Sequence, residues 1–174
     1  MRTVILGERP PAIEALIESR RATGADRRDE IWEGDYHMNP APRKRHSILQ
    51  SQLTELLGPL ARRRRLVPGA DFNLGVEDNY RIPDYGLHRD DSDMVFIDTA
   101  ALVLEVLSPD DETWEKVPFY ADHGVDEVVV VDPAARTVTW LVLRDGSYEP
   151  TDRSKLLDVD VDDVAGRIDW PPID

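Results

Sequence analysis

Two acidic residues and one lysine are the residues of this sequence best suited to chemistry. Glu105 interrupts the apolar run Leu102-Val-Leu-Glu-Val-Leu107, which is typical of a buried strand. A lone carboxylate inside such a strand is costly unless it is paired, protonated or bound to a metal. Alternation along a strand puts Glu105 on the same face as Val103. By itself, Glu105 is better explained as a structural acid that opens into solvent at the end of the strand.

Asp84 supplies a second carboxylate. It follows Pro83, and a proline there indicates an edge strand or the start of a strand. If that strand neighbours the Glu105 strand, the two carboxylates converge. Hard divalent cations bind one or two carboxylates together with substrate phosphate, and such a cation polarises the phosphoryl group and activates water. The pair therefore predicts a phosphodiester hydrolase that uses Mg²⁺ or Mn²⁺.

Lys116 is the third candidate residue. It lies in the helix expected to follow the Glu105 strand, and a helix that packs back on the sheet could bring its amine to the carboxylates. There it could orient the attacking water or stabilise charge in the transition state. The alternative is an ordinary surface lysine beside Glu112 and Glu115.

These residues belong to a longer series of short motifs. In chain order the series is Glu33-Gly34-Asp35, Met38-x-Pro-x-Pro42, His46, Pro83-Asp84, Glu105-Val-Leu-Ser-Pro109, Lys116-x-x-x-Tyr120 and Gly124-Val-x-Glu-x-x-x-Val-Asp-Pro133. Between about residues 30 and 148 this series resembles the Uma-type putative restriction endonuclease family of bacteria. That family belongs to the PD-(D/E)XK nuclease superfamily, and the resemblance implies a restriction-endonuclease-like core, a mixed sheet flanked by helices.

The resemblance also implies roles for particular residues. The implied metal ligands are Asp84, Glu105 and Val106, and the implied catalytic residues are Asp84, Glu105 and Lys116. Asp35 and His46 would be accessory, as a further ligand or a phosphate contact.

One position departs from the superfamily pattern. Leu107 stands two residues after Glu105, where the superfamily has lysine, so Lys116 would take that lysine's place. The alternative function is therefore a nucleic-acid- or protein-binding module on the same fold with decayed catalysis.

Charge is unevenly distributed along the chain. The net charge is -14, which opposes DNA binding, and residues 145–174 hold nine acids against three bases. Residues 43–65 hold seven bases against one acid. Arg43, Lys44 and Arg45 are the candidate nucleic-acid contacts, although a solvated helix with charged ends explains them equally well. A weaker alternative is a protein whose acidic tail masks this basic face.

Periodicity predicts an α/β fold in one domain spanning residues 1–174, with a core at about 30–148 and an acidic tail at 149–174. Helices are expected over residues 10–21, 43–62 and 114–123, and the 43–62 helix should end or kink at Gly58-Pro59. The strand–helix–strand order over residues 101–131 predicts a parallel pair. Antiparallel hairpins should follow, with a turn at Asp145-Gly146.

Some classes of protein are excluded by composition. The sequence has no cysteine, so disulfides, thiolate metal sites and a cysteine nucleophile are excluded. No apolar run approaches the roughly 18 residues that a membrane span requires. We expect a cytoplasmic protein with DNA as its partner and no membrane contact. A homodimer is compatible, because this superfamily often cuts as a dimer.

Overall fold

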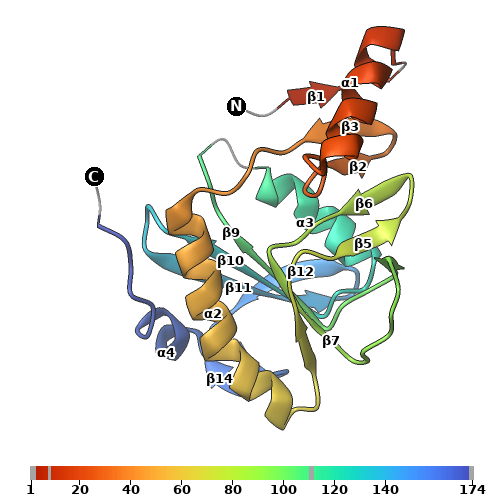
Figure 1. Cartoon of the computed structure of the whole chain (residues 1–174). Helices are drawn as coiled ribbons and strands as arrows, with labels where there is room; N and C mark the ends of the chain where they lie inside the picture. The colour runs from red at the N-terminus through yellow and green to blue at the C-terminus, as the bar shows by residue number, and fades with distance from the viewer. Residues whose placement is uncertain (1–2, 8, 110–111, 173–174) are drawn as a thin grey trace.

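The computed structural model describes residues 3–7, 9–109 and 112–172, and its architecture is a mixed α/β fold (Figure 1). The helices are α1 (Pro11–Thr23), α2 (Lys44–Arg63), α3 (Thr113–Asp122) and α4 (Val161–Ala165). The strands are β1 (Thr3–Ile5), β2 (Glu30–Trp32), β3 (Asp35–Met38), β4 (Val67–Gly69), β5 (Asn73–Val76), β6 (Asn79–Arg81), β7 (Tyr85–His88), β8 (Phe96–Ile97), β9 (Leu102–Val106), β10 (Glu127–Asp132), β11 (Thr137–Arg144), β12 (Ser147–Thr151), β13 (Arg153–Ser154) and β14 (Val159–Asp160). Among these described helices, none is long and apolar enough to cross a membrane.

The central sheet has six strands in the order β12-β11-β10-β9-β7-β4. Strands β9 and β10 are parallel and joined through α3, which confirms the predicted strand–helix–strand unit. The remaining pairs in this sheet are antiparallel. The β11–β12 hairpin turns at Asp145 and Gly146, whose φ angles of 48° and 82° suit a tight hairpin turn. The predicted mixed sheet is therefore present.

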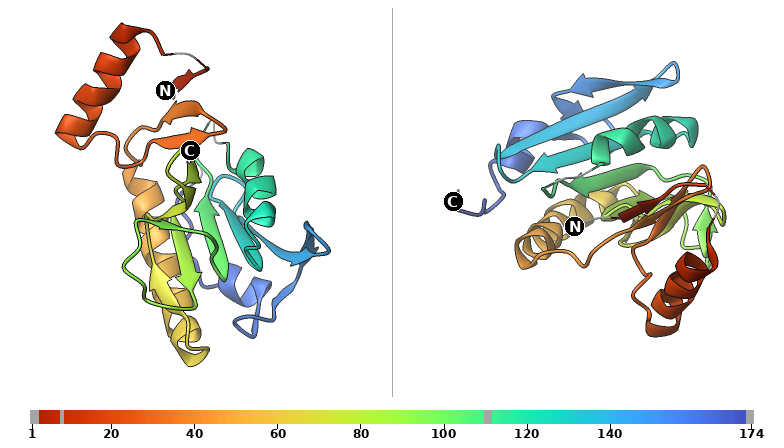
Figure 2. Two further views of the ribbon diagram at one scale, coloured as in Figure 1. Left: turned by 90° about the vertical axis from the view of Figure 1, so that its right-hand side faces the viewer. Right: turned by 90° about the horizontal axis from the view of Figure 1, so that it is seen from above.

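A second six-stranded sheet, in the order β1-β3-β2-β6-β5-β8, carries α1 on its N-terminal part. The β2–β3 hairpin turns at Glu33 and Gly34, as the sequence predicts. Ile17 of α1 packs against Tyr36 and Met38 of β3 in a small apolar cluster. This N-terminal part lies at the opposite end of the molecule from α4 (Figure 2). Residues 39–43 lead from β3 to α2 and so to the rest of the fold.

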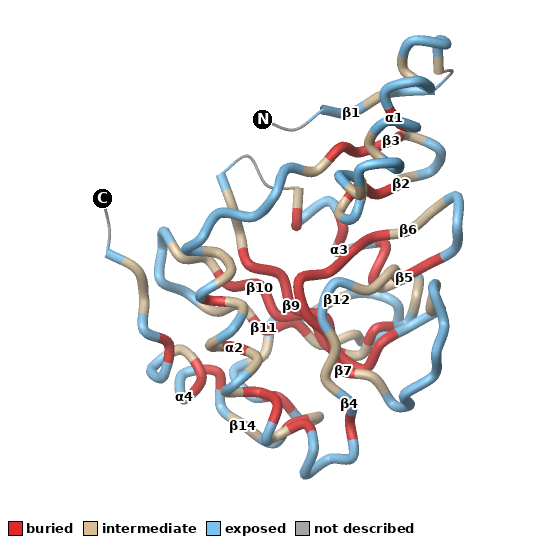
Figure 3. The backbone as a smooth tube through the Cα atoms, in the orientation of Figure 1, coloured by how far each residue is buried: buried red, intermediate tan, exposed pale blue. Residues whose placement is uncertain are grey.

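The core is divided by the two faces of β9. Leu102, Leu104 and Val106 pack in the cluster that contains the apolar side of α2, including Leu53. Val103 points the other way, into the cluster that contains Phe119 and Tyr120 of α3. Strand β9 is buried along its whole length, as are most residues of β7 and β10 (Figure 3). Alternation therefore places Glu105 on the α3 face.

Helix α2 continues through Pro59 to Arg63, so the predicted end of the helix at Gly58-Pro59 is wrong. Proline cannot donate to the carbonyl of the residue four positions earlier, which is Glu55. Both Glu55 and Pro59 are exposed, so water can satisfy that carbonyl. The apolar stripe on the other side of the helix keeps its packing, and this outweighs one missing hydrogen bond.

The C-terminal segment packs on the same core. After β12 the chain forms the β13–β14 pair and α4. Its apolar residues join the α2-side cluster, namely Leu157, Val161, Val164 and Ile168. Its acids, such as Asp162 and Asp163, lie on the exposed side.

Candidate active site

Asp84 lies directly before β7, which pairs antiparallel with β9 in the register Tyr85 to Leu104. The strand that follows Asp84 is therefore a neighbour of the Glu105 strand, which is the condition under which the two carboxylates converge. The Oδ2 atom of Asp84 accepts a hydrogen bond of 2.9 Å from the backbone N–H of Val106, next to Glu105. Asp84 is buried, with 6% of its surface exposed. The strand pairing fixes this carboxylate beside the C-terminal end of β9.

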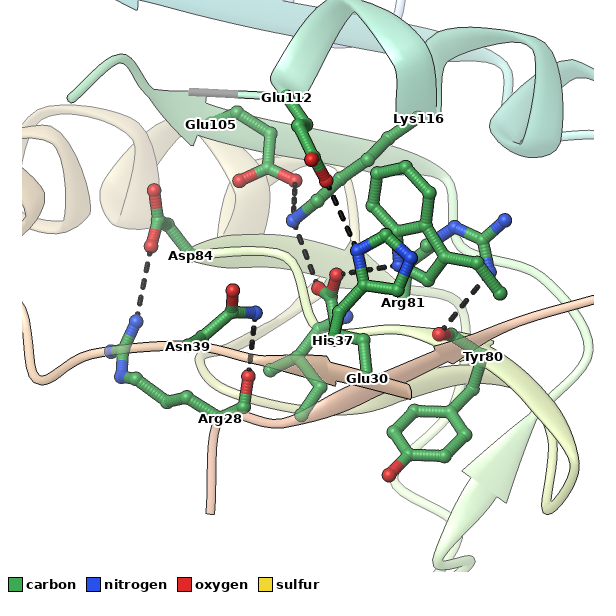
Figure 4. Close-up of polar contacts among 12 residues, drawn as sticks. Arg28, Glu30, His37, Asn39, Tyr80, Arg81, Asp84, Glu105, Glu112 and Lys116 are labelled. Atoms are coloured by element: carbon green, nitrogen blue, oxygen red, sulfur yellow. Dashed lines mark hydrogen bonds and ion pairs between the residues drawn. The ribbon is translucent and has the colours of Figure 1, made fainter. Parts of the chain in front are cut away.

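Glu105 is buried, with 3% of its surface exposed, and it faces α3. Its Oε1 atom accepts hydrogen bonds from the Lys116 amine at 3.2 Å and from the Tyr120 hydroxyl. Within the part of the chain that the structure describes, no donor reaches Oε2. Figure 4 shows the Asp84 and Glu105 carboxylates next to one another. One oxygen of Glu105 is thus available for a further cation or water.

Lys116 extends from α3 to join two acids. Its amine lies 2.9 Å from Oε1 of Glu30 as well as 3.2 Å from Glu105. Glu30 is itself held by the backbone N–H of Ile82 at 2.7 Å and by the indole N–H of Trp32 at 2.8 Å. The lysine predicted as a site residue is therefore buried beside Glu105.

The charges in this cluster shift one another's pKa values. Burial raises the pKa of Glu105 to about 7, Lys116 opposes this effect, and the Asp84 charge adds to it. Burial would lower the pKa of Lys116, but Glu105 and Glu30 outweigh burial and raise it. Burial would raise the pKa of Asp84, but the hydrogen bond and charge of His46 outweigh burial and hold it below the ordinary value. Lys116 is a cation at neutral pH, and of the Asp84–Glu105 pair it is Glu105 whose pKa is raised.

His46, in the first turn of α2, contacts this cluster. Its Nε2 lies 2.9 Å from Oδ1 of Asp84 and its Nδ1 lies 3.3 Å from the Ser108 hydroxyl. Burial would lower the pKa of His46, but the hydrogen bond and charge of Asp84 outweigh burial and raise it. The nearby Gln50 side chain donates to the backbone carbonyl of Asp84. Helix α2 therefore fixes Asp84 from the side opposite α3.

The other predicted residues lie in two places. Arg43, Lys44 and Arg45 are exposed at the start of α2, within three residues of His46. Asp35 instead accepts a hydrogen bond from the backbone of Gly7 at 2.9 Å, near the β2–β3 turn. The contacts of the described residues do not bring Asp35 to the carboxylate pair.

Sequence reasoning missed Arg28 and Glu30. Arg28 reaches Asp84 across 56 residues of sequence, with its Nη1 3.3 Å from Oδ1 of Asp84. Glu30 reaches Lys116 across 86 residues. Glu30 stands at the start of a short strand, whereas Glu105 interrupts an apolar run, so the pattern that singled out Glu105 was absent at Glu30. Charged residues before a strand otherwise look like a solvated turn.

A hard divalent cation fits this donor set better than a softer metal. Magnesium binds one or two carboxylates and completes its shell with water and phosphate, which suits two buried acids with a free oxygen on Glu105. Structural zinc needs four ligands, usually cysteine or histidine. Within residues 3–7, 9–109 and 112–172, no three His, Cys, Asp or Glu side chains form a group that could hold a metal ion.

The comparisons with known proteins agree with this fold. The model of the Uma2 family, described as a putative restriction endonuclease family, matches residues 14–163, and the chain belongs to that family. The fold is also that of a solved structure from Anabaena variabilis, described as a putative nuclease belonging to DUF820. The two chains are 18% identical with a TM-score of 0.59, covering 80% of this chain and 90% of that one. No curated protein matches the sequence.

Proposed function

We propose that this protein is a metal-dependent endonuclease that hydrolyses phosphodiester bonds of DNA. Asp84 and Glu105, with the backbone of Val106, would hold Mg²⁺ or Mn²⁺. When bound, the ion would polarise the phosphoryl group and activate water for attack. The observation that carries the proposal is the convergence of two buried carboxylates from neighbouring strands on a buried lysine. The restriction endonuclease description of the family supports the choice of reaction.

Lys116 would act as a hydrogen-bond donor in this reaction. Its raised pKa keeps it protonated, so it cannot serve as the base that takes a proton from water. A fixed ammonium beside the carboxylates can orient water or stabilise the negative charge that develops on the phosphoryl oxygens. Tyr120 shares the same Glu105 oxygen and would keep that carboxylate in place.

The start of α2 is the surface that we propose contacts the DNA backbone. Its first turn contains no acid, and Arg43, Lys44 and Arg45 are exposed there. Positive charge at a helix N-terminus opposes the helix dipole, whereas a phosphate there is favoured by the dipole and by the free N–H groups. The second basic group, residues 62–65, lies at the other end of this 20-residue helix, about 30 Å away. The first group lies within three residues of His46, which contacts Asp84.

A plasmid-cleavage assay with Mg²⁺ or Mn²⁺ tests the proposal. We expect the native chain to nick or linearise supercoiled DNA, and EDTA to stop the reaction. Asp84→Asn and Glu105→Gln keep the side-chain shape and should abolish cleavage. Glu115→Gln, an exposed acid on α3, is the matched control and should leave cleavage unchanged. The ratio of nicked to linear product also reports whether two copies act together on one duplex.

Leu107 favours a second candidate, because it occupies the position where the superfamily has lysine. In that case the chain is a nucleic-acid- or protein-binding module with decayed catalysis. Cleavage that is absent with both metals, or that is equal in the native chain and Glu105→Gln, would contradict the nuclease and favour this module. Calorimetric titration with Mn²⁺ then separates the nuclease from the binding module further. A functional metal site should bind Mn²⁺ in the native chain and lose that binding in Asp84→Ala.

A further inference from the structure

Among the residues that the structure describes, Arg28 is the cation that approaches Asp84 from outside the α2 and α3 contacts (Figure 4). Its backbone is fixed, because its carbonyl accepts a 2.7 Å hydrogen bond from the Asn39 amide and the next residue, Asp29, binds Arg20 in two contacts of 2.6 Å. The long side chain remains 23% exposed. The guanidinium is therefore the movable part of an otherwise fixed residue.

The two contacts of this guanidinium are unequal. Nη2 lies 2.6 Å from Oδ1 of Asp71, a normal length for a charge-assisted hydrogen bond. Nη1 lies 3.3 Å from Oδ1 of Asp84, which is long for such a bond. Asp71 is 48% exposed, whereas Asp84 is 7% exposed in its side chain. Arg28 is thus held mainly by Asp71, at the surface, and rests loosely on the buried carboxylate.

Arg28 approaches a carboxylate that a metal would need. Oδ2 of Asp84 accepts the Val106 N–H, and Oδ1 contacts both His46 and Arg28. A divalent cation on either oxygen of Asp84 and a guanidinium 3.3 Å from Oδ1 would repel each other strongly in a buried site. The metal and Arg28 are therefore alternatives at Asp84.

From this geometry we propose that Arg28 occupies the cation position at Asp84 until a divalent metal binds, and then turns to a phosphate of the nucleic acid. The proposal rests on the function proposed above and adds a regulatory contact to it. A planar guanidinium binds phosphate through two parallel hydrogen bonds, so the released side chain has a suitable ligand at the mouth of the site. Phosphate binding would draw Arg28 from Asp84, and metal and nucleic acid would strengthen each other's binding.

Metal affinity in the absence of nucleic acid is the primary test. If Arg28 occupies Asp84 about nine-tenths of the time, its removal should tighten Mn²⁺ binding about tenfold. Calorimetric titration of Arg28→Gln with Mn²⁺ measures this change. Arg27→Gln, an exposed neighbour with the same loss of charge, is the matched control and should bind Mn²⁺ as the native chain does. Arg28→Lys keeps the charge and should remain near the native affinity.

Asp71 provides a second arm. In Asp71→Asn the guanidinium loses its stronger partner and should rest more fully on Asp84, so Mn²⁺ binding should weaken. In the double variant with Arg28→Gln, the Asp71 substitution should have no effect. A simple loss of negative charge near the metal would instead weaken binding equally in both backgrounds, and that result would contradict the proposal.

Nucleic-acid affinity provides the third arm. In EDTA, Arg28→Gln and the native chain should bind a short labelled DNA duplex equally, because Arg28 is held at Asp84. In Ca²⁺, Arg28→Gln should bind the duplex about tenfold more weakly than the native chain does. Fluorescence anisotropy of the labelled duplex measures both affinities.

Unchanged or weaker Mn²⁺ binding in Arg28→Gln would overturn the placeholder role while leaving the metal site intact. Mn²⁺ binding that is absent in the native chain, or that survives Asp84→Ala, would instead overturn the proposed function, and the role of Arg28 with it. Thermal melting of each variant verifies that it is folded.

Discussion

The amine of Lys116 lies 2.9 Å from a carboxylate oxygen of Glu30, although 86 residues separate them in the chain. The same amine lies 3.2 Å from Glu105. Glu30 belongs to the N-terminal sheet and Glu105 to the central sheet, so one lysine on α3 connects both. This connection makes Lys116 a structural element as well as a candidate catalytic residue.

Lys116→Met should therefore destabilise the fold strongly. Removing one partner from a buried ion pair leaves an uncompensated charge, which typically costs about 3–5 kcal/mol. Here two carboxylates would lose their shared cation. Urea unfolding of the metal-free protein measures the change. Lys155→Met, at an exposed position, is the control and should change stability by less than about 0.5 kcal/mol.

The double variant Glu105→Gln, Lys116→Met tests the cause of that destabilisation. If an uncompensated buried charge is responsible, neutralising Glu105 should recover part of the lost free energy of unfolding. A double variant as unstable as Lys116→Met alone would show that lost packing, and not charge, explains the effect.

Glu105→Gln alone should stabilise the metal-free protein at neutral and higher pH. The pKa of Glu105 is raised to about 7 in the folded chain from an ordinary 4.5, so the folded state binds more protons between these values. Stability of the native chain should then fall as pH rises from about 4.5 to 7, and the loss should persist above 7.

Thermal melts in EDTA across this pH range measure the difference between Glu105→Gln and the native chain. The melting temperatures should be similar near pH 4.5 and should separate towards pH 7. A difference that stays constant with pH would contradict the raised pKa. A variant more stable than the native chain but inactive is the pattern expected when a site is built at the expense of stability.

Glu127→Ala should have the opposite effects to Glu105→Gln. It should lower the stability of the fold and leave the candidate site without a direct change. Glu127 is as buried as Glu105, on the adjacent parallel strand. Its carboxylate is fully engaged by the Trp140 indole at 2.7 Å, the Ser154 hydroxyl at 2.6 Å and the Leu156 N–H at 3.1 Å. Loss of these contacts should cost about 3 kcal/mol or more.

Urea unfolding measures that cost, and Mn²⁺ titration of the folded variant verifies the site. Glu149→Ala removes an exposed acid from β12 and should change stability by less than about 1 kcal/mol. Weakened Mn²⁺ binding by folded Glu127→Ala would show that this acid does contribute to the metal site.

Pro59→Ala should stabilise α2. Alanine restores the N–H that can bond to the Glu55 carbonyl and removes the steric conflict of the ring, a gain of about 1–2 kcal/mol after the greater freedom of the unfolded chain is subtracted. Chemical denaturation measures it, with Ser51→Ala on the same helix as the control. A destabilised Pro59→Ala would indicate that the proline has a packing role that its exposure does not suggest.

Local pattern was sufficient to predict the elements that carry the two main acids. The apolar run around Glu105, the following helix and the next apolar run specify a parallel unit through short-range rules. The Asp145-Gly146 and Glu33-Gly34 turns are likewise local, because their residues tolerate positive φ angles. In α2 the apolar stripe predicted the helix correctly, while the proline rule failed because Pro59 faces solvent.

The rest of the cluster depends on contacts between distant segments. Arg28 precedes an ordinary hairpin and Glu30 begins it, and nothing near them specifies that Asp84 and Lys116 will be their partners. Asp35 is the opposite case. Its short motif predicted an accessory site residue, but in the β2–β3 hairpin its side chain accepts a hydrogen bond from the backbone of Gly7. Side-chain partners across two sheets are set by packing, which the periodicity of a single segment does not contain.

The separation of Glu30 and Lys116 along the chain also bears on how the protein is made. A ribosome produces the N-terminal segment first, and α3 appears only after strands β1 to β9 have been synthesised. Until then Glu30 has no lysine and Asp84 lacks the Val106 N–H that fixes it. A nascent or truncated chain that lacks α3 therefore contains no assembled cluster, and whatever chemistry the site performs begins only after α3 has been made and has packed on the sheet.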